Sequence, residues 1–229
     1  MIQTVLMDLD DTIFDFLRCE REALAASLRD FGIPPEDAVL SAYSAINLAQ
    51  WKLLEQGKIT RDALSVRRFA ILAERFGLSF SPEAMTAHYD ARLAESCFLA
   101  DGAADVLADL SRHYALYAAT NGSAHIQHSR IKRSGIGQFL SGVFISEEIG
   151  ANKPEAAFFA RCFAKIPEFN RQTAVMVGDS LTSDIRGGKN AGLQTVWLCH
   201  NPQEQPDSDN TPDAVIHSLT ELPTILEKM

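Results

Sequence analysis

The stretch TVLMDLDDT, residues 4–12, decides the fold, because a short apolar run in it meets a cluster of acidic residues. Residues 4–7 are rich in strand formers and Asp8 closes the run, so the pattern predicts a buried β-strand that ends in a loop. A second apolar run, residues 173–177, is likewise followed by an acidic residue, Asp179. Apolar strands followed by polar side chains are typical of the open edge of a parallel sheet.

Strand and helix patterns alternate along the chain after Gly102. This alternation predicts an α/β fold in which helices cover a parallel, Rossmann-like sheet. Right-handed crossovers bring the loops after successive strands of such a sheet to one crevice, where a site is expected. The polar residues 201–212 are predicted to form a surface loop. The predicted strands are residues 4–7, 115–119, 143–146, 173–177, 195–198 and 214–216.

The segment between the first two strands shows helical periodicity and almost no strand pattern. Pro34 and Pro35 separate its first two helices, and Gly57 ends the second. Thr60 can cap a third helix, and Ser81, followed by proline and glutamate, can open a fourth. We therefore predict an α/β core domain, residues 1–14 and 98–229, interrupted by an all-helical domain, residues 15–97.

The composition excludes several classes of protein. The 229 residues are 46% hydrophobic and 22% charged, as in globular proteins. The 30 acidic residues outnumber the 21 lysines and arginines, giving a net charge of −9, which disfavours binding to nucleic acid or to an anionic membrane. Residues 1–7 fit neither a signal peptide nor a spanning helix, so a cytoplasmic protein is expected. The expected assembly is a monomer or a homodimer. The four cysteines lack a C-x-x-C spacing and are expected to be reduced thiols.

Polar side chains follow each predicted core strand. Taken singly, such residues often cap the next helix. Together, however, three carboxylates beside one lysine would repel one another unless a cation lay among them. Oxygen ligands of this kind suit Mg²⁺, which keeps room for a substrate phosphate. The residues are Asp8 and Asp10, Thr120 and Asn121, Lys153, and Asp179.

These residues resemble the four motifs of the haloacid dehalogenase (HAD) superfamily. Each motif follows a predicted strand, the motifs come in the family's order, and together they cover the whole core. The helical insert resembles that family's cap domain of type C1. The motifs are Asp8-Leu9-Asp10-Asp11-Thr12, Thr120-Asn121-Gly122, Lys153-Pro154, and Gly178-Asp179-Ser180 followed by Asp184.

The resemblance implies a Mg²⁺-dependent phosphomonoester hydrolase. Its catalytic residues would be Asp8, Asp10, Thr120 and Lys153. Asp8 would attack phosphorus to form an aspartyl phosphate, and Asp10 would serve as acid and base. Thr120, the Asn121 amide and Lys153 would hold the phosphoryl oxygens. The metal would be held by the Asp8 carboxylate, the Asp10 carbonyl and Asp179, with Asp184 acting through water or by orienting Lys153.

Four further stretches are informative: residues 46–51, residues 55–62 (EQGKITRD), Arg68-Phe69, and residues 178–188 (GDSLTSDIRGG). They resemble one branch of the family, the pyrimidine 5′-nucleotidases of the YjjG/YfnB type. A nucleotidase needs a flat apolar surface for the base, which Phe16 or Trp51 can provide, and donors to base carbonyls, which Asn47 or Arg68 can provide. Ordinary packing is the alternative for these four, because Asn47 and Trp51 are spaced i, i+4 on one helix. The predicted substrate is a pyrimidine nucleoside monophosphate.

Two rival functions stay open. The same chemistry on a sugar phosphate or phosphoglycolate would use the same core motifs. A non-catalytic protein that binds a phosphorylated ligand is disfavoured, because binding alone does not require a paired nucleophile and acid. Dehalogenation is also disfavoured, because the dehalogenase branch lacks the acid/base aspartate found here at position 10.

Three further patterns are predicted to be structural. Gly187-Gly188-Lys189 resembles the end of a P-loop but lacks the required flanking residues, so a helix start is favoured. His125 and His128 lack a third ligand at zinc-site spacing. The basic cluster of Arg130, Lys132 and Arg133 is predicted to be a solvated helix face, with anion binding as the alternative.

Overall fold

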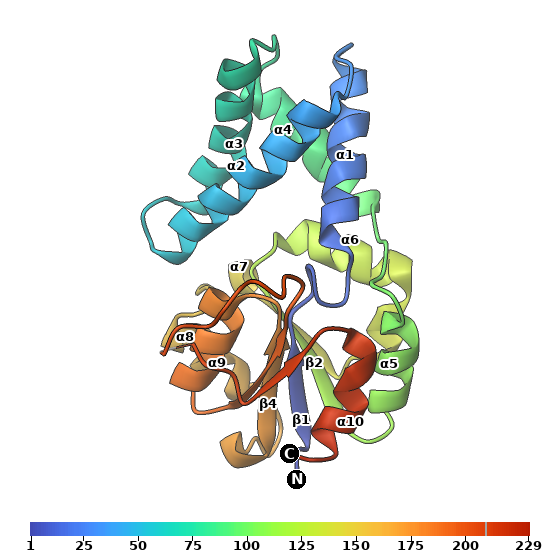
Figure 1. Ribbon diagram of the computed structural model, residues 1–229, viewed down its shortest axis with the longest axis vertical. Helices are drawn as coiled ribbons and strands as arrows, with labels where there is room; N and C mark the ends of the chain where they lie inside the picture. The colour runs from blue at the N-terminus through green and yellow to red at the C-terminus, as the bar shows by residue number, and fades with distance from the viewer. Residues whose placement is uncertain (209) are drawn as a thin grey trace. The chain divides into compact units, whose positions relative to one another are not determined.

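The computed structural model describes residues 1–208 and 210–229; residue 209, part of the predicted loop of residues 201–212, lies outside the described residues. The chain divides into two compact units. Met1–Asp15 together with Phe98–Met229 contains the sheet, and Phe16–Cys97 is helical (Figure 1). Asp15 thus belongs to the unit that contains the sheet, whereas the sequence pattern assigned it to the helical insert.

Within the described residues, six parallel strands form one sheet in the order β3-β2-β1-β4-β5-β6. The predicted α/β fold with a parallel sheet is confirmed, and each strand end lies within one residue of its predicted position. The strands are β1 (Thr4–Met7), β2 (Ala115–Thr120), β3 (Gly142–Ile145), β4 (Ala174–Gly178), β5 (Gln194–Leu198) and β6 (Ala214–Ile216).

β1 lies in the centre of the sheet, between β2 and β4. All four of its residues are buried, which explains why this strand has a continuous apolar run rather than an alternating pattern. The parallel register pairs Met7 with Ala118 of β2 and with Val177 of β4. Asp8 and Asp179 follow these paired strands, so both leave the sheet at its carboxyl edge.

Helices cover both faces of the sheet, with α8 and α9 on one side and α5 and α10 on the other (Figure 1). The apolar face of α8, including Phe158, Phe159 and Cys162, packs into a hydrophobic core cluster with residues of the sheet such as Leu6 and Met176. None of the described helices combines the length and apolar character that crossing a membrane requires. The helices are α5 (Ala103–Leu110), α6 (Ala124–Ser134), α7 (Ser146–Ile149), α8 (Ala156–Phe163), α9 (Arg186–Asn190) and α10 (Leu222–Leu226), with short turns η1 (Ile136–Phe139), η2 (Arg171–Thr173), η3 (Leu181–Ile185) and η4 (Leu219–Glu221).

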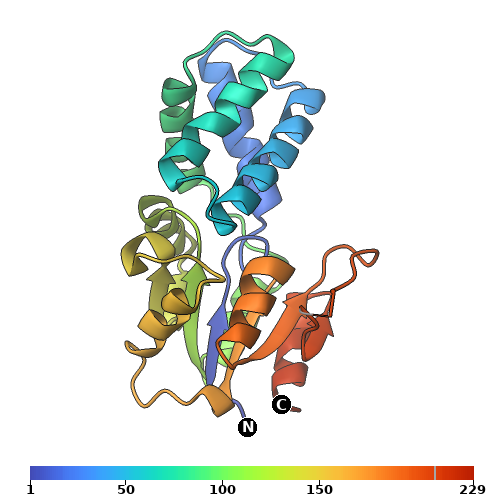
Figure 2. The ribbon, with the colours of Figure 1, turned by 90° about the vertical axis from the view of Figure 1, so that its left-hand side faces the viewer.

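Residues 16–97, all of them described, form four helices (Figure 2). Their ends follow the predicted signals: the Thr60 hydroxyl accepts a hydrogen bond from the Ala63 N–H at 3.2 Å, and Ser81 caps the fourth helix in the same way. Stacked and tilted rings of Tyr43, Phe69 and Tyr89 fill the interior. The helices are α1 (Phe16–Asp30), α2 (Asp37–Glu55), α3 (Arg61–Phe76) and α4 (Pro82–Glu95).

Candidate active site

The loop after β1 turns tightly at the edge of the sheet. Asp8 extends β1 by one residue through a backbone hydrogen bond of 2.9 Å to β4. Asp11 then adopts a positive φ of 54°, a conformation that aspartate tolerates better than most residues. The turn places Thr12, which is fully buried, with its hydroxyl 3.4 Å from a carboxylate oxygen of Asp179. The first motif is therefore tied directly to the residue that follows β4.

Lys153 is buried at the centre of the site, with 1% of its surface exposed. Its ammonium group donates to Oδ1 of Asp8, to Oδ1 of Asp184 and to the carbonyl of Ala119, each at 2.6 Å. An ammonium group has three N–H donors, so these contacts use all of them. The Asn121 side chain holds the Lys153 backbone at both ends, accepting from its N–H at 2.8 Å and donating to its carbonyl at 2.9 Å. Lys153 is thus fixed by a residue of the second motif.

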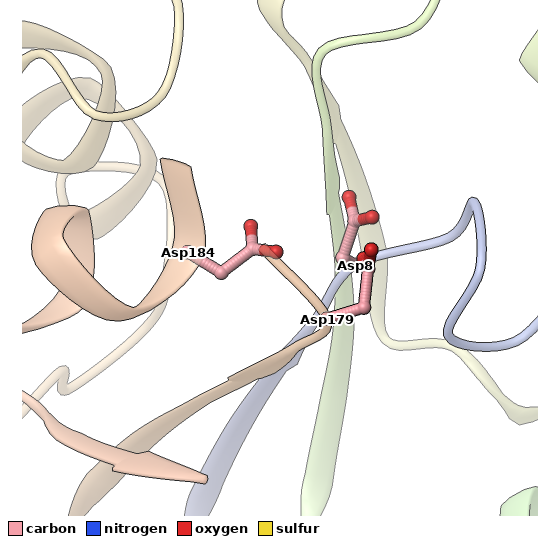
Figure 3. Close-up of side chains that lie close together, drawn as sticks. All are labelled: Asp8, Asp179 and Asp184. Atoms are coloured by element: carbon pink, nitrogen blue, oxygen red, sulfur yellow. The ribbon is translucent and has the colours of Figure 1, made fainter. Parts of the chain in front are cut away.

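Three carboxylates meet beside this lysine: Asp8, Asp179 and Asp184 (Figure 3). Each offers one oxygen, and these oxygens lie within 4.8 Å of one another. The backbone N–H of Ser180 donates to Asp184 at 3.1 Å and so orients its side chain. Gly178 is required here, because a Cβ on it would lie 2.2 Å from Oδ2 of Asp184. The structure therefore brings together Asp8, Lys153 and Asp179, three of the four charged residues that the strand ends indicated. The fourth member of the cluster is Asp184 of the last motif, which takes the place expected for Asp10.

The charges in this cluster are unbalanced. Burial raises the pKa of Asp8 to about 7, Lys153 opposes the shift, and Asp184 and Asp10 add to it. Burial and the charges of Asp184 and Asp8 also raise the pKa of Asp179 well above its usual range. Burial lowers the pKa of Lys153, but attraction to Asp184 and Asp8 outweighs burial, so the net shift is upward. One ammonium group facing three carboxylates leaves excess negative charge, and this set of oxygen donors fits a hard divalent cation such as Mg²⁺.

Asp10 lies in a different environment, beside α6. Gln127 donates from Nε2 to Oδ2 of Asp10 at 2.6 Å, and Arg130 pairs with Oδ1 of Asp10. Arg130 was predicted to belong to a solvated face, and that prediction is wrong: its side chain is fully buried, with its guanidinium 4.1 Å from the centre of the Phe14 ring. Lys132 and Arg133 are exposed, as predicted.

The sequence patterns did not single out Gln127, and they misplaced Arg130 because it was grouped with its basic neighbours Lys132 and Arg133. Gln127 precedes Arg130 by three residues and Ile131 by four, and this i, i+3 and i, i+4 spacing places all three on one face of α6. Ile131 is buried. An apolar residue on the same face was the available signal that this side of the helix is covered.

The family model of haloacid dehalogenase-like hydrolases matches residues 2–192, a range that includes the whole charged cluster. The chain is a haloacid dehalogenase-like hydrolase. This match confirms the resemblance indicated by the four motifs and shows that the protein is an enzyme.

Named relatives cover nearly the whole of this hydrolase. Pyrimidine 5′-nucleotidase PynA of Streptococcus pneumoniae is 37% identical to it, over 98% of this chain and 94% of PynA. Pyrimidine 5′-nucleotidase YjjG of Escherichia coli is 31% identical, over 98% of this chain and 97% of YjjG. The crystal structure of the HAD-hydrolase YfnB of Bacillus subtilis bound to magnesium is 36% identical, with a TM-score of 0.93 and 98% of each chain covered. The predicted similarity to the YjjG/YfnB branch is confirmed.

The four residues of the hydrolase that were predicted to contact a base all belong to the helical unit. Asn47 and Arg68 are buried: Asn47 donates to Glu20 at 2.7 Å and accepts from Arg68 at 3.2 Å. These hydrogen bonds hold both side chains inside the helical unit, where they contribute to its packing. Phe16 and Trp51 are half-buried, and the Arg61 guanidinium lies 5.5 Å from the centre of the Trp51 ring. Base contact by these residues stays a prediction.

The glycines of the P-loop-like sequence serve packing in this hydrolase. A Cβ on Gly187 would lie 2.7 Å from Phe159, and a Cβ on Gly188 would lie 2.9 Å from Met176. Both glycines therefore allow α9 to approach the core closely. His128, on the exposed side of α6, lies 2.8 Å from Glu148.

Proposed function

We propose that this hydrolase is a Mg²⁺-dependent phosphatase that acts through an aspartyl phosphate, with pyrimidine nucleoside 5′-monophosphates as its substrates. The observation that carries the proposal is the cluster of Asp8, Asp179 and Asp184 around Lys153. Phosphoryl transfer requires a nucleophile and a cation that neutralises the phosphoryl oxygens. The geometry of the cluster supports both, with Asp8 as the nucleophile next to a cation site. The names of PynA and YjjG support the choice of nucleotide.

In the proposed first step, Asp8 attacks phosphorus and the phosphorus–oxygen bond to the nucleoside breaks. Asp10 gives its proton to the departing oxygen. In the second step, Asp10 takes a proton from water, which attacks the aspartyl phosphate, releases inorganic phosphate and restores the Asp8 carboxylate. Throughout, Thr120, the backbone amide of Asn121 and the Lys153 ammonium hold the phosphoryl oxygens. To do so, the ammonium group exchanges one of its three hydrogen bonds within the protein for a bond to a phosphoryl oxygen.

The proposed magnesium ligands are the Asp8 carboxylate, the Asp10 carbonyl and Asp179, with Asp184 held next to them by Lys153. When bound, Mg²⁺ neutralises the charge that the carboxylates and the phosphoryl group bring together. The fit rests on the donor set, since three oxygens lie within 4.8 Å of one another and Lys153 balances only one of their charges.

Magnesium is expected to stabilise the protein against heat. At a concentration one hundred times its Kd, a ligand that binds only the folded state adds about 2.7 kcal/mol, or roughly 5–10 °C in Tm for a chain of this size. The measurement is a thermal melt with and without Mg²⁺. Asp179→Asn should remove most of the shift, whereas Asp109→Asn, at an exposed position, should keep it. An unchanged shift in the Asp179 variant would contradict the proposed ligand set.

The stabilisation by magnesium should grow as the pH rises. Because the folded-state pKa of Asp8 is raised from 3.8 to about 7, its contribution to stability without metal falls as pH rises through that range. Magnesium binds the ionised carboxylates and opposes this loss. We expect a larger shift in Tm at about pH 8 than at about pH 5.5.

A panel of phosphomonoesters tests the substrate. Pyrimidine nucleoside monophosphates should give a kcat/KM at least about tenfold higher than purine nucleotides, sugar phosphates or phosphoglycolate, since base contacts are worth about 1–3 kcal/mol. Released phosphate is measured in Mg²⁺ buffer, with the Asp8→Asn protein as the blank. A preference for sugar phosphates over every nucleotide would replace the nucleotidase proposal with its rival, while retaining the chemistry at Asp8.

A further inference from the structure

The side chain of Arg130 is unusual because it is fully buried and its guanidinium pairs with Asp10, an aspartate at the rim of the site. Its guanidinium lies against the Phe14 ring, and it pairs with Oδ1 of Asp10, whose side chain is 26% exposed. Burying an arginine has a large desolvation cost, and an apolar side chain of similar size often stabilises a core as well or better. General packing therefore does not explain an arginine here, whereas the orientation of Asp10 does.

Gln127 connects the same aspartate to the second motif. Its Nε2 lies 2.6 Å from Oδ2 of Asp10 and 3.2 Å from the hydroxyl of Thr120, and its Oε1 accepts from Arg130 at 3.2 Å. Gly122 leaves the space for this side chain, because a Cβ there would lie 2.2 Å from the Gln127 Nε2. The Gln127 side chain is thus held by three hydrogen-bond partners, and it links Asp10 to Thr120 through its Nε2.

We propose that Gln127 and Arg130 are positioning residues that hold the Asp10 carboxyl group in the orientation required for proton transfer. This inference rests on the proposed function, in which Asp10 is the acid and base. Each oxygen of Asp10 accepts one bond from α6, and a carboxylate oxygen has a second lone-pair direction with which to face the reacting groups. Two donors from one helix restrict rotation of the carboxyl group more than one donor could.

The dependence of rate on the leaving group tests this role. An alkoxide needs a proton from Asp10 as it departs, whereas p-nitrophenolate is weakly basic and does not. We expect Arg130→Met to lower kcat/KM for a nucleoside monophosphate by about 10²-fold, and for p-nitrophenyl phosphate by less than about tenfold. The ratio kcat/KM covers only the steps up to release of the alcohol, so the later hydrolysis of the aspartyl phosphate does not affect the comparison.

Matched variants separate positioning from structural damage. Gln127→Met should show the same dependence on the leaving group as Arg130→Met, and Arg130→Lys should recover part of the activity. Arg133→Met, at an exposed position on the same helix, should leave both rates unchanged. If Arg130→Met does not fold, Gln127→Met and Arg130→Lys decide the question.

A double mutant provides the second readout. If Arg130 acts only through Asp10, Arg130→Met should lower the kcat/KM of an Asp10→Asn enzyme by less than about threefold. Equal losses on both leaving groups, or full additivity with Asp10→Asn, would overturn the inference and leave the proposed function intact. Absence of phosphatase activity in the parent enzyme would instead overturn the proposed function, and this inference with it.

Discussion

Asp8→Asn should lower turnover of every phosphomonoester by about 10⁴-fold or more, because the change removes the nucleophile itself. An amide at this position can still accept the hydrogen bond from Lys153 that Asp8 Oδ1 accepts at 2.6 Å. The fold should therefore survive while the chemistry is lost. Phosphate release under saturating substrate and Mg²⁺ measures the effect.

The matched control is Asp11→Asn, which removes one negative charge from the same loop. Asparagine tolerates the positive φ of 54° at this position, so we expect activity within about threefold of the parent enzyme. Acid quenching during turnover should trap one phosphoryl group on the peptide that contains Asp8, and mass spectrometry should detect it. Turnover by the Asp8 variant, or a phosphoryl group on another residue, would exclude the proposed intermediate.

The sheet and the charged cluster could be predicted from the sequence because both depend on local patterns. The apolar run of β1 indicates a strand buried on both faces, and parallel strands place the residues after their carboxyl ends at one edge. The order of strands and polar residues along the chain was sufficient to place Asp8, Lys153 and Asp179 close together. Their mutual distances and the upward pKa shifts depend on burial, which the sequence does not show directly.

The environment of Asp10 could not be predicted in the same way. Arg130 lies 120 residues further along the chain, and its two basic neighbours on α6 made the segment resemble a solvated face. A helical pattern indicates which residues share a face, but not which loop covers that face. In the helical unit, the same limit applies to Asn47 and Trp51, whose i, i+4 spacing on one helix allowed either packing or ligand contact.

Lys153→Met should destabilise the fold by about 3–5 kcal/mol, roughly 6–20 °C in Tm, because it leaves two carboxylates without their common counterion. Asp184 has no side-chain exposure, and that of Asp8 is only 11%. Methionine fills much of the same volume, so the loss reflects charge more than a cavity. Denaturant unfolding of the metal-free protein measures it, with the exposed Lys165→Met as the control.

The pH dependence of this loss distinguishes charge from packing. Lys153 lowers the pKa of Asp8, so without the lysine that carboxyl group should hold its proton to higher pH. A protonated carboxyl needs no counterion, and the loss of stability should therefore be smaller at about pH 5.5 than at about pH 8. Mg²⁺ should restore part of the stability at the higher pH, because a bound cation compensates the same carboxylates. A loss of stability that is equal at both pH values and unaffected by Mg²⁺ would contradict this explanation. It would mean that Lys153 supports the site by packing, and that its ammonium group does not balance the negative charge of the carboxylates at the sheet edge.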